Sequence, residues 1–306
     1  MKVLIIGLGS IAKKHIIAIR EIVPDSVIYA LRSQENSNHF DDIINVYDWK
    51  IAKDVDFIII SNPTKSHEVT ILKAIEFNKP LFIEKPVLES LKNADKIIKL
   101  IKDRRIPTYV AYVLRFHPII KALKELINKT SSKIDEVNVY CGSYLPDWRP
   151  NTDFRKCYSA NKELGGGVHL DLTHEIDYIY WFWGNPIEVK KNIRSQSHLK
   201  INAFDYANYQ LIYPDFVVNL TLNYYRKKSK RTIEILSEDF ILEGDLLNYN
   251  LIDILNEKEI YKKSDQEKNL YEVQMQYFID ILDKNEFYEN NIEIGIEILK
   301  ISLDKL

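Results

Sequence analysis

The amino-acid sequence predicts an α/β fold of two domains, in which a doubly wound parallel sheet precedes a second domain built on mostly antiparallel strands. In the first third of the chain, short continuous apolar runs alternate with amphipathic stretches, which is typical of buried parallel strands covered by helices. After about residue 118, the strands alternate apolar and polar residues, as in sheets with one solvated face. We place residues 1–117 in the first domain and 118–306 in the second.

The elements of the first domain follow from apolar periodicity and from the residues that interrupt it. Pro24 ends the first helix, and Ser66 is a suitable N-cap for the second. Apolar residues at helical spacing from Leu91 to Ile101 indicate a third helix. We expect strands at 3–6, 27–31, 56–61, 81–83 and 108–113, and helices at 11–23, 66–77 and 90–103.

The second domain is expected to combine an alternating sheet with a few helices. Its strands are predicted at 136–144, 206–213, 217–225 and 232–236, and its helices at 119–127, 170–183, 270–282 and 292–303. The basic run Lys227-Lys228-Ser229-Lys230-Arg231 lies between two of these strands, so we expect a solvated hairpin turn there.

Charge and composition exclude several classes of protein. The 42 basic and 44 acidic residues give a net charge of −2, which excludes a strongly basic nucleic-acid-binding footprint. No apolar run approaches the ~20 residues of a membrane span. Cys141 and Cys157 lack metal-ligand spacing, so we expect no metal site and a reducing, cytoplasmic location.

A glycine-rich loop follows the first predicted strand and opens the first helix. In Gly7-Leu8-Gly9-Ser10-Ile11-Ala12, Gly7 permits a tight turn and Gly9 lets the backbone approach a pyrophosphate, which the helix amides would face. The loop predicts a dinucleotide site that includes Gly7, Gly9, Ser10 and Ile11. The alternative is a tight strand–helix turn in another kind of α/β protein.

The end of the second strand bears on the choice of dinucleotide. An NAD site expects a carboxylate there for the ribose 2′-hydroxyl, but the chain reads Ala30-Leu31-Arg32-Ser33 and has no carboxylate before Glu35. Arg32 and Ser33 suit a 2′-phosphate, so NADP is favoured and NAD stays possible. The alternative is that Arg32 is a solvated loop residue.

Two further clusters carry chemistry. Glu84-Lys85-Pro86 ends a buried strand, where open parallel sheets bind ligands, so Lys85 can hydrogen-bond a reacting oxygen with Glu84 positioning it. Gly165-Gly166-Gly167 opens a predicted helix on which Asp171 and His174 stand three apart, on one face, and a histidine suits removal of a hydroxyl proton. The alternative for Glu84 and Lys85 is an ordinary ion pair at the end of a strand. The alternative for Asp171 and His174 is a capped, partly buried start of a helix. Whether the Lys85–Pro86 bond is cis stays open.

A loop after the first strand of the second domain carries candidate substrate contacts. Trp148 can stack on a sugar face, while Arg149 and Arg155 can bind phosphate or carboxylate. Arg115 is a further candidate for contact with the substrate in the cleft that this loop would border. The alternative is that this aromatic loop packs against the domain junction or a second subunit.

Taken together, these segments resemble the Gfo/Idh/MocA family of nicotinamide-dependent oxidoreductases. The segments that match in order and spacing are the loop and helix from Gly7 to His15, Ser61-Asn62-Pro63 with His67, Glu84-Lys85-Pro86, Arg115-Phe116-His117-Pro118, and Gly165 to Asp177. Many members have the aspartate and histidine four apart rather than three, and many have a glycine-containing turn where this chain reads Leu236-Ser237-Glu238-Asp239.

The resemblance implies a Rossmann domain followed by a dihydrodipicolinate-reductase-like α/β domain, whose open, mostly antiparallel sheet commonly mediates homodimers or homotetramers. It implies hydride transfer at a hydroxyl carbon of a sugar, cyclitol or related small molecule. Lys85 matches the family's lysine that contacts both substrate and nicotinamide. Asp171 and His174 match the family's acid–base pair. The further cofactor-binding positions that it implies are Ser61, Asn62, His67 and Glu84.

The favoured function is an NADP-dependent oxidoreductase acting on a sugar, a cyclitol or a phosphorylated or nucleotide-linked sugar, with a possible role in surface-glycan biosynthesis. One alternative uses the same site to oxidise transiently and cleave a glycosidic bond, as some relatives do. The other is a nonenzymatic sensor that binds dinucleotide, which would need no proton-transfer residues.

Overall fold

The computed structural model describes residues 1–33, 42–150, 152–264, 267–284 and 288–303. The chain divides into two compact units. Unit 1 comprises Met1–Val113 and Lys268–Leu299, and unit 2 comprises the remaining described residues. The sequence-based division assigned all of 118–306 to one domain, whereas residues 268–299 return to unit 1.

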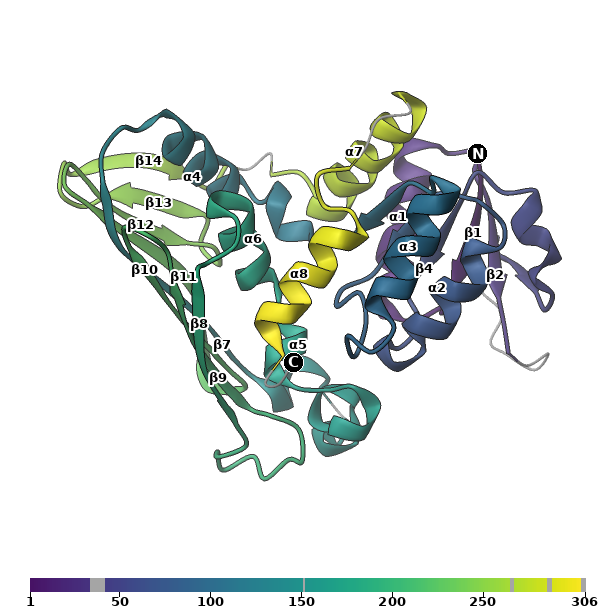
Figure 1. Cartoon of the computed structure of the whole chain (residues 1–306), viewed down its shortest axis with the longest axis horizontal. Helices are drawn as coiled ribbons and strands as arrows, with labels where there is room; N and C mark the ends of the chain where they lie inside the picture. Colours follow the sequence, from purple (N-terminus) through teal and green to yellow (C-terminus); the bar gives the residue numbers. More distant parts are fainter. Residues whose placement is uncertain (34–41, 151, 265–266, 285–287, 304–306) are drawn as a thin grey trace. The chain divides into compact units, whose positions relative to one another are not determined.

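Unit 1 is a parallel sheet of six strands within the described residues, in the order β3-β2-β1-β4-β5-β6. From β1 the chain adds β2 and β3 on one side, and from β4 it adds β5 and β6 on the other side. Because crossovers between parallel strands are right-handed, α1 covers one face of the sheet, and α2 and α3 cover the opposite face (Figure 1). The bounds are β1 (Lys2–Ile6), α1 (Ser10–Ile22), β2 (Val27–Leu31), β3 (Ile44–Val46), β4 (Phe57–Ile60), α2 (His67–Ile75), β5 (Leu81–Ile83), α3 (Ala94–Arg104), β6 (Thr108–Val110), α7 (Leu270–Lys284) and α8 (Ile292–Ser302).

The C-terminal helix α7 joins unit 1 because its apolar face completes the core of the parallel sheet. The ring of Phe278 lies 4.9 Å from that of Phe57 and 5.2 Å from that of Phe82, and it also packs on Tyr109. All four rings are fully buried. The local apolar pattern of residues 270–282 predicts such a helix but does not say which sheet it covers.

Unit 2 contains an eight-stranded sheet in the order β14-β13-β12-β11-β7-β10-β9-β8, counted over the described residues. Every neighbouring pair is antiparallel except β7 with β10. The bounds are α4 (Pro118–Lys129), β7 (Ile134–Tyr144), α5 (Val168–Asp171), α6 (His174–Trp183), β8 (Glu188–Arg194), β9 (Tyr206–Ile212), β10 (Val217–Asn223), β11 (Tyr225–Ser237), β12 (Ile241–Asp245), β13 (Asn250–Asp253) and β14 (Lys258–Lys262).

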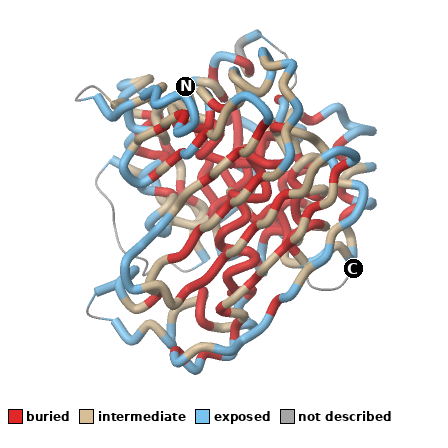
Figure 2. Tube along the Cα trace, turned by 90° about the vertical axis from the view of Figure 1, so that its left-hand side faces the viewer, coloured by how far each residue is buried: buried red, intermediate tan, exposed pale blue. Residues whose placement is uncertain are grey.

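One face of this sheet is covered and the other is open. Buried residues alternate with half-buried ones along β9 and β10, visible as red and tan along the strands in Figure 2. Helices α4 and α6 lie on the same face of the sheet, and no described helix covers the other (Figure 1). The alternating pattern that predicted a half-exposed sheet is therefore confirmed.

Short 3-10 turns connect several of these elements. They are η1 (Trp49–Lys53), η2 (Thr64–Ser66), η3 (Val113–Phe116), η4 (Leu145–Trp148), η5 (Phe154–Lys156), η6 (Tyr158–Ala160) and η7 (Lys162–Leu164). Those from η4 to η7 occupy the loop that precedes α5. No helix in the described part of the chain has the length and hydropathy needed to cross a bilayer.

Two local predictions for unit 2 are wrong. The basic run 227–231 is not a hairpin turn but part of β11, where the rings of Tyr140 and Tyr144 lie under neighbouring cations and support an extended conformation. The helix predicted at 170–183 is broken into α5 and α6, because Leu172 leaves helical dihedrals at φ −102° and ψ 36°.

Candidate functional site

The loop after β1 is held against the end of β4. Gly7 has a φ of +93°, and a Cβ atom there would lie 2.3 Å from the backbone nitrogen of Asn62. The Ser61 hydroxyl donates to the Gly7 carbonyl at 2.8 Å. Only glycine fits this position, because both the dihedral and the close approach exclude a side chain.

The loop leaves the N-terminus of α1 open. A Cβ atom at Gly9 would meet nothing within 4 Å, and Gly9 is the N-cap of α1 without a side-chain hydrogen bond to the helix amides. The first turn of α1 contains no acidic residue. Unsatisfied amides, a favourable helix dipole and free space fit the pyrophosphate of a dinucleotide.

Arg32 follows β2 at the predicted position of the nucleotide's ribose. Its backbone nitrogen donates to the Val46 carbonyl at 2.9 Å, and its Nη1 is buried without a hydrogen-bond partner among the described residues. A buried donor in this state is destabilising, and an anionic acceptor such as a 2′-phosphate would satisfy it. Glu35, the first carboxylate after the strand, lies outside the described residues.

Glu84 connects α1 to Lys85. Its Oε1 lies 2.6 Å from Nε2 of the buried His15, and its Oε2 accepts a 3.2 Å hydrogen bond from the Lys85 backbone nitrogen. The Lys85–Pro86 peptide bond is cis. The hydrogen bond to Glu84 holds the Lys85 backbone where β5 ends, next to the switch in strand order.

His67 ties the turn after Lys85 to the loop after β4. Its Nε2 lies 2.9 Å from the Asn62 carbonyl, and its Nδ1 lies 3.1 Å from that of Pro86 and 3.2 Å from that of Val87. Burial lowers the pKa of His67, although the carbonyl acceptors oppose this. These contacts assign His67 a structural part, while its predicted contact with the cofactor stays a prediction.

In unit 2, Asp171 is bound by two tyrosine hydroxyls. Tyr224 donates to Oδ2 at 2.5 Å, and Tyr158 donates to Oδ1. Asp171 is 5% exposed and Tyr224 is fully buried, whereas Tyr158 is half-buried. Neither tyrosine is among the predicted site residues. Tyr158 lies in the loop predicted to contact substrate, whereas nothing in a chain with 19 tyrosines distinguishes Tyr224 before folding.

Trp148 belongs to the same cluster. Its ring meets that of Tyr224 edge-on at 5.3 Å, and its Nε1 donates to the Ser143 hydroxyl at 3.0 Å. At 39% exposed, it keeps part of its indole face accessible. The structure therefore brings the predicted Trp148 and Asp171 together through Tyr224, although Trp148 as a sugar-binding residue stays a prediction.

Asp171 and His174 do not share one continuous helix. Asp171 is the last residue of α5 and half-buried His174 is the first of α6. The argument that a three-residue spacing places both on one helical face is thus wrong in its premise. Their predicted roles as an acid–base pair stay predictions.

Arg115 is engaged within unit 2. Its Nε and Nη2 donate to Asp177 of α6, with a shortest distance of 2.6 Å, and both side chains are buried. Burial raises the pKa of Asp177 to about 6, against the opposing charge of Arg115. This pair anchors α6, and substrate binding by Arg115 stays a prediction.

Arg149 and Arg155 are exposed residues of the loop that precedes α5. The Arg155 guanidinium stacks on the Phe154 ring at 4.5 Å and lies 3.8 Å from Asp153. Their predicted contacts with substrate remain predictions.

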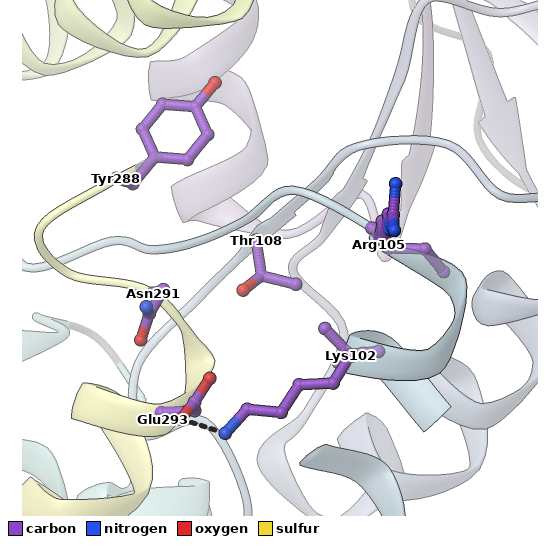
Figure 3. A pocket seen from close by; sticks show the side chains of 8 residues that line it. Lys102, Arg105, Thr108, Tyr288, Asn291 and Glu293 are labelled. Carbon is purple, nitrogen blue, oxygen red and sulfur yellow. Dashed lines mark ion pairs between the residues drawn. The ribbon is translucent and has the colours of Figure 1, made fainter. Parts of the chain in front are cut away.

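A separate pocket of about 440 Å³ in unit 1 contains none of the predicted residues (Figure 3). Its charged lining is partly neutralised by an ion pair of 2.8 Å between Lys102 and Glu293, drawn as a dashed line in the figure. The described residues contain no group of His, Cys, Asp or Glu side chains suited to a metal ion.

A parallel sheet with an open glycine loop, followed by a half-covered sheet and a buried aspartate at the end of α5, defines a protein of the two-domain nucleotide-binding class. The chain belongs to the Gfo/Idh/MocA family. Residues 1–112 match the oxidoreductase family's NAD-binding Rossmann fold, and residues 120–242 match the GFO/IDH/MocA C-terminal domain. The family resemblance inferred from the motifs is confirmed.

Individual relatives are distant. Myo-inositol 2-dehydrogenase of Thermotoga maritima is 24% identical over 201 residues, covering 61% of this chain and 56% of its own. 2,7-Anhydro-N-acetylneuraminate hydratase of Mediterraneibacter gnavus is 27% identical over 141 residues, covering 45% of this chain and 36% of its own. The chain thus matches about half or less of the length of these curated relatives.

Among solved structures, UDP-N-acetylglucosamine 3-dehydrogenase from Acidithiobacillus ferrooxidans superimposes with a TM-score of 0.79. The match covers 100% of this chain and 96% of that one, at 17% sequence identity. At this identity the likeness establishes the fold, and the predicted two-domain α/β architecture is confirmed.

Proposed function

We propose that this protein is an NADP(H)-dependent oxidoreductase that transfers hydride at a hydroxyl or keto carbon of a sugar, cyclitol or sugar nucleotide. The observation that carries the proposal is the open N-terminus of α1 behind Gly7, in the unit where His15 and Glu84 fix the Lys85 backbone. The relatives named for inositol and for UDP-N-acetylglucosamine support a polyhydroxylated substrate.

Each group has a distinct part in this proposal. Gly7, Gly9 and the first amides of α1 hold the pyrophosphate, and Arg32 with Ser33 holds the 2′-phosphate. The bound dinucleotide supplies the hydride chemistry. The implied cofactor contacts of Ser61, Asn62 and His67 are indirect, through the loop that they shape.

The proton chemistry is assigned to the protein. When an alcohol carbon is oxidised, its hydroxyl must lose a proton, and His174 accepts it in our proposal. Lys85 hydrogen-bonds the same oxygen and stabilises the negative charge that develops on it. Asp171 supplies a fixed negative charge that favours the protonated histidine. In the reverse direction, His174 returns the proton to the oxygen of the keto carbon.

Substitution of Lys85 tests the assignment. With the wild-type protein, NADP⁺ and a panel that includes myo-inositol and UDP-N-acetylglucosamine should give reduced cofactor on at least one member. Lys85→Met should lower turnover by about two orders of magnitude or more while leaving NADPH affinity nearly intact. The exposed Lys96→Met on α3 is the matched control. Turnover that persists in Lys85→Met would contradict the assignment.

The preference for NADP is tested at Arg32. Arg32→Ala should weaken NADPH binding about tenfold or more relative to NADH, because only NADPH carries the 2′-phosphate. Fluorescence titration with both cofactors measures this, with NADH as the internal control. Equal losses for the two cofactors would refute the preference.

The transient-oxidation alternative has one specific support, the relative named as a hydratase of 2,7-anhydro-N-acetylneuraminate. Such a reaction would consume substrate without a net change in the cofactor, whereas a dehydrogenase produces one reduced cofactor per turnover. A nonenzymatic sensor would instead bind dinucleotide and show no turnover with any substrate. We also propose a cytoplasmic homodimer or homotetramer formed through the open face of the eight-stranded sheet.

A further inference from the structure

We propose that Tyr158 and Tyr224 are positioning residues of the reaction, which clamp the Asp171 carboxylate from both of its oxygens and hold it as a fixed anion. The inference deepens the proposed function and rests on it for the catalytic part. Neither tyrosine belongs to the site that the sequence predicts.

Both oxygens of the Asp171 carboxylate accept a hydrogen bond from a tyrosine hydroxyl. Tyr224 donates to Oδ2 and Tyr158 to Oδ1, so each oxygen receives a hydroxyl from a different part of the chain. Tyr224 follows β10, and Tyr158 lies in η6. Two donors arriving from separate elements restrict rotation of the carboxylate and favour its ionised form.

The hydroxyl of Tyr224 acts as a permanent donor. Burial raises the pKa of this group well above its ordinary value, and the negative charge of Asp171 raises it further. The hydroxyl therefore keeps its proton throughout the working range of an enzyme. Because Tyr224 is fully buried, it acts through Asp171 and not by touching substrate.

The clamp is also linked to the predicted substrate loop. The Trp148 ring packs edge-on against Tyr224, and the Leu145 backbone nitrogen donates to the Tyr224 carbonyl at 2.8 Å. The turn η4 therefore contacts the residue that orients Asp171 through both its ring and its backbone.

The first experiment measures kinetics. Tyr158→Phe and Tyr224→Phe should each lower kcat about tenfold to a hundredfold, because each removes a hydrogen bond to a charged group. The KM and the NADPH dissociation constant should change little. Tyr213→Phe is the matched control, since its buried hydroxyl donates to the Gly184 carbonyl, away from the cluster. A kcat unchanged relative to Tyr213→Phe would overturn the proposal.

The second experiment asks whether the tyrosines act through Asp171. Asp171→Asn keeps the shape of the side chain but loses the charge and replaces one accepting oxygen with a donating amide. In this background, adding Tyr224→Phe should lower kcat by less than about twofold. If the fold-losses in kcat caused by the two substitutions multiply fully, Tyr224 acts independently of Asp171 and the proposal fails.

The third measurement needs no substrate. Urea unfolding of wild type, Tyr224→Phe, Asp171→Asn and the double variant should give midpoint losses that are less than additive. Additive losses would contradict the clamp whether or not the protein is an oxidoreductase. Conversely, a coupled unfolding cycle in a protein without turnover on any sugar would count against the proposed function alone.

Discussion

His15 of α1 and Glu84 at the end of β5 form a buried contact of 2.6 Å between Nε2 and Oε1. The same carboxylate accepts the backbone N–H of Lys85 through its other oxygen. The helix that is expected to bind the pyrophosphate and the strand end that carries the proposed catalytic lysine are therefore fixed to one another by a single glutamate.

Removal of this glutamate should be costly. Glu84→Ala leaves the buried His15 ring without its partner, so the free energy of unfolding should fall by about 2–4 kcal/mol. Lys99→Ala, which breaks an exposed pair with Asp103, should change it by at most about 0.5 kcal/mol. Urea unfolding measures both, and equal losses would show that the His15–Glu84 contact contributes no special stability.

The two loop glycines should respond in opposite ways. Gly7→Ala places a methyl group 2.3 Å from the Asn62 nitrogen at a positive φ, and it should destabilise the fold by about 2 kcal/mol or more. Gly9→Ala enters open space and should leave the unfolding free energy nearly unchanged while weakening dinucleotide binding. Calorimetric binding and urea unfolding separate the two effects. A stable Gly7→Ala variant would contradict the tight-turn interpretation.

The Arg115–Asp177 pair should be a structural requirement of unit 2. Arg115→Ala strands a buried carboxylate and should lower the unfolding free energy by about 3–5 kcal/mol. The double variant Arg115→Met with Asp177→Leu should recover part of this loss, because neither charge then remains buried. No recovery in the double variant would mean that the ion pair itself, and not relief of a stranded charge, determines stability.

His117 should make stability depend on pH. Burial lowers the pKa of His117 to about 4; the Leu246 carbonyl opposes this shift and the charge of Arg231 adds to it. The unfolded histidine, with a pKa near 6.5, binds a proton first, so the stabilising contribution is full above about pH 6.5 and is lost as pH falls toward 4.

The corresponding variant is His117→Asn, which retains an N-cap acceptor for the Ile119 backbone nitrogen. Between pH 7 and pH 4, the unfolding free energy of wild type should fall by about 3 kcal/mol relative to that of His117→Asn. Taking the difference between the two proteins cancels the contributions of His169 and Asp177, which titrate in the same range. A constant difference would show that folding does not lower the pKa of His117.

The fold class was open to prediction because it depends on local patterns. Continuous apolar runs and two-residue alternation distinguish strands buried on both faces from strands buried on one, and Pro24 and Gly7 mark where elements end and begin. The local patterns do not predict the short strand β3 or the strands β8 and β12 to β14, since their periodicity is weak or they are few residues long.

The candidate site was predictable only in part. Gly7 and the Glu84-Lys85-Pro86 turn sit at strand ends, so their neighbourhood follows from the topology of a parallel sheet. Tyr158 and Tyr224 reach Asp171 from 13 and 53 residues away, and Arg115 reaches Asp177 from 62 residues away. No spacing rule connects residues that far apart.

By itself, the sequence determined the fold class, many of the strands and helices, the glycine loop and the residue types available for chemistry, because these depend on backbone preferences and on periodic burial over a few residues. Only the tertiary structure decided that α7 packs on the parallel sheet of unit 1 and that the predicted helix breaks between Asp171 and His174. The tertiary structure also decided that Tyr158 and Tyr224 donate hydrogen bonds to Asp171. Those outcomes depend on which distant surfaces exclude water together, and that choice is made when the whole chain packs.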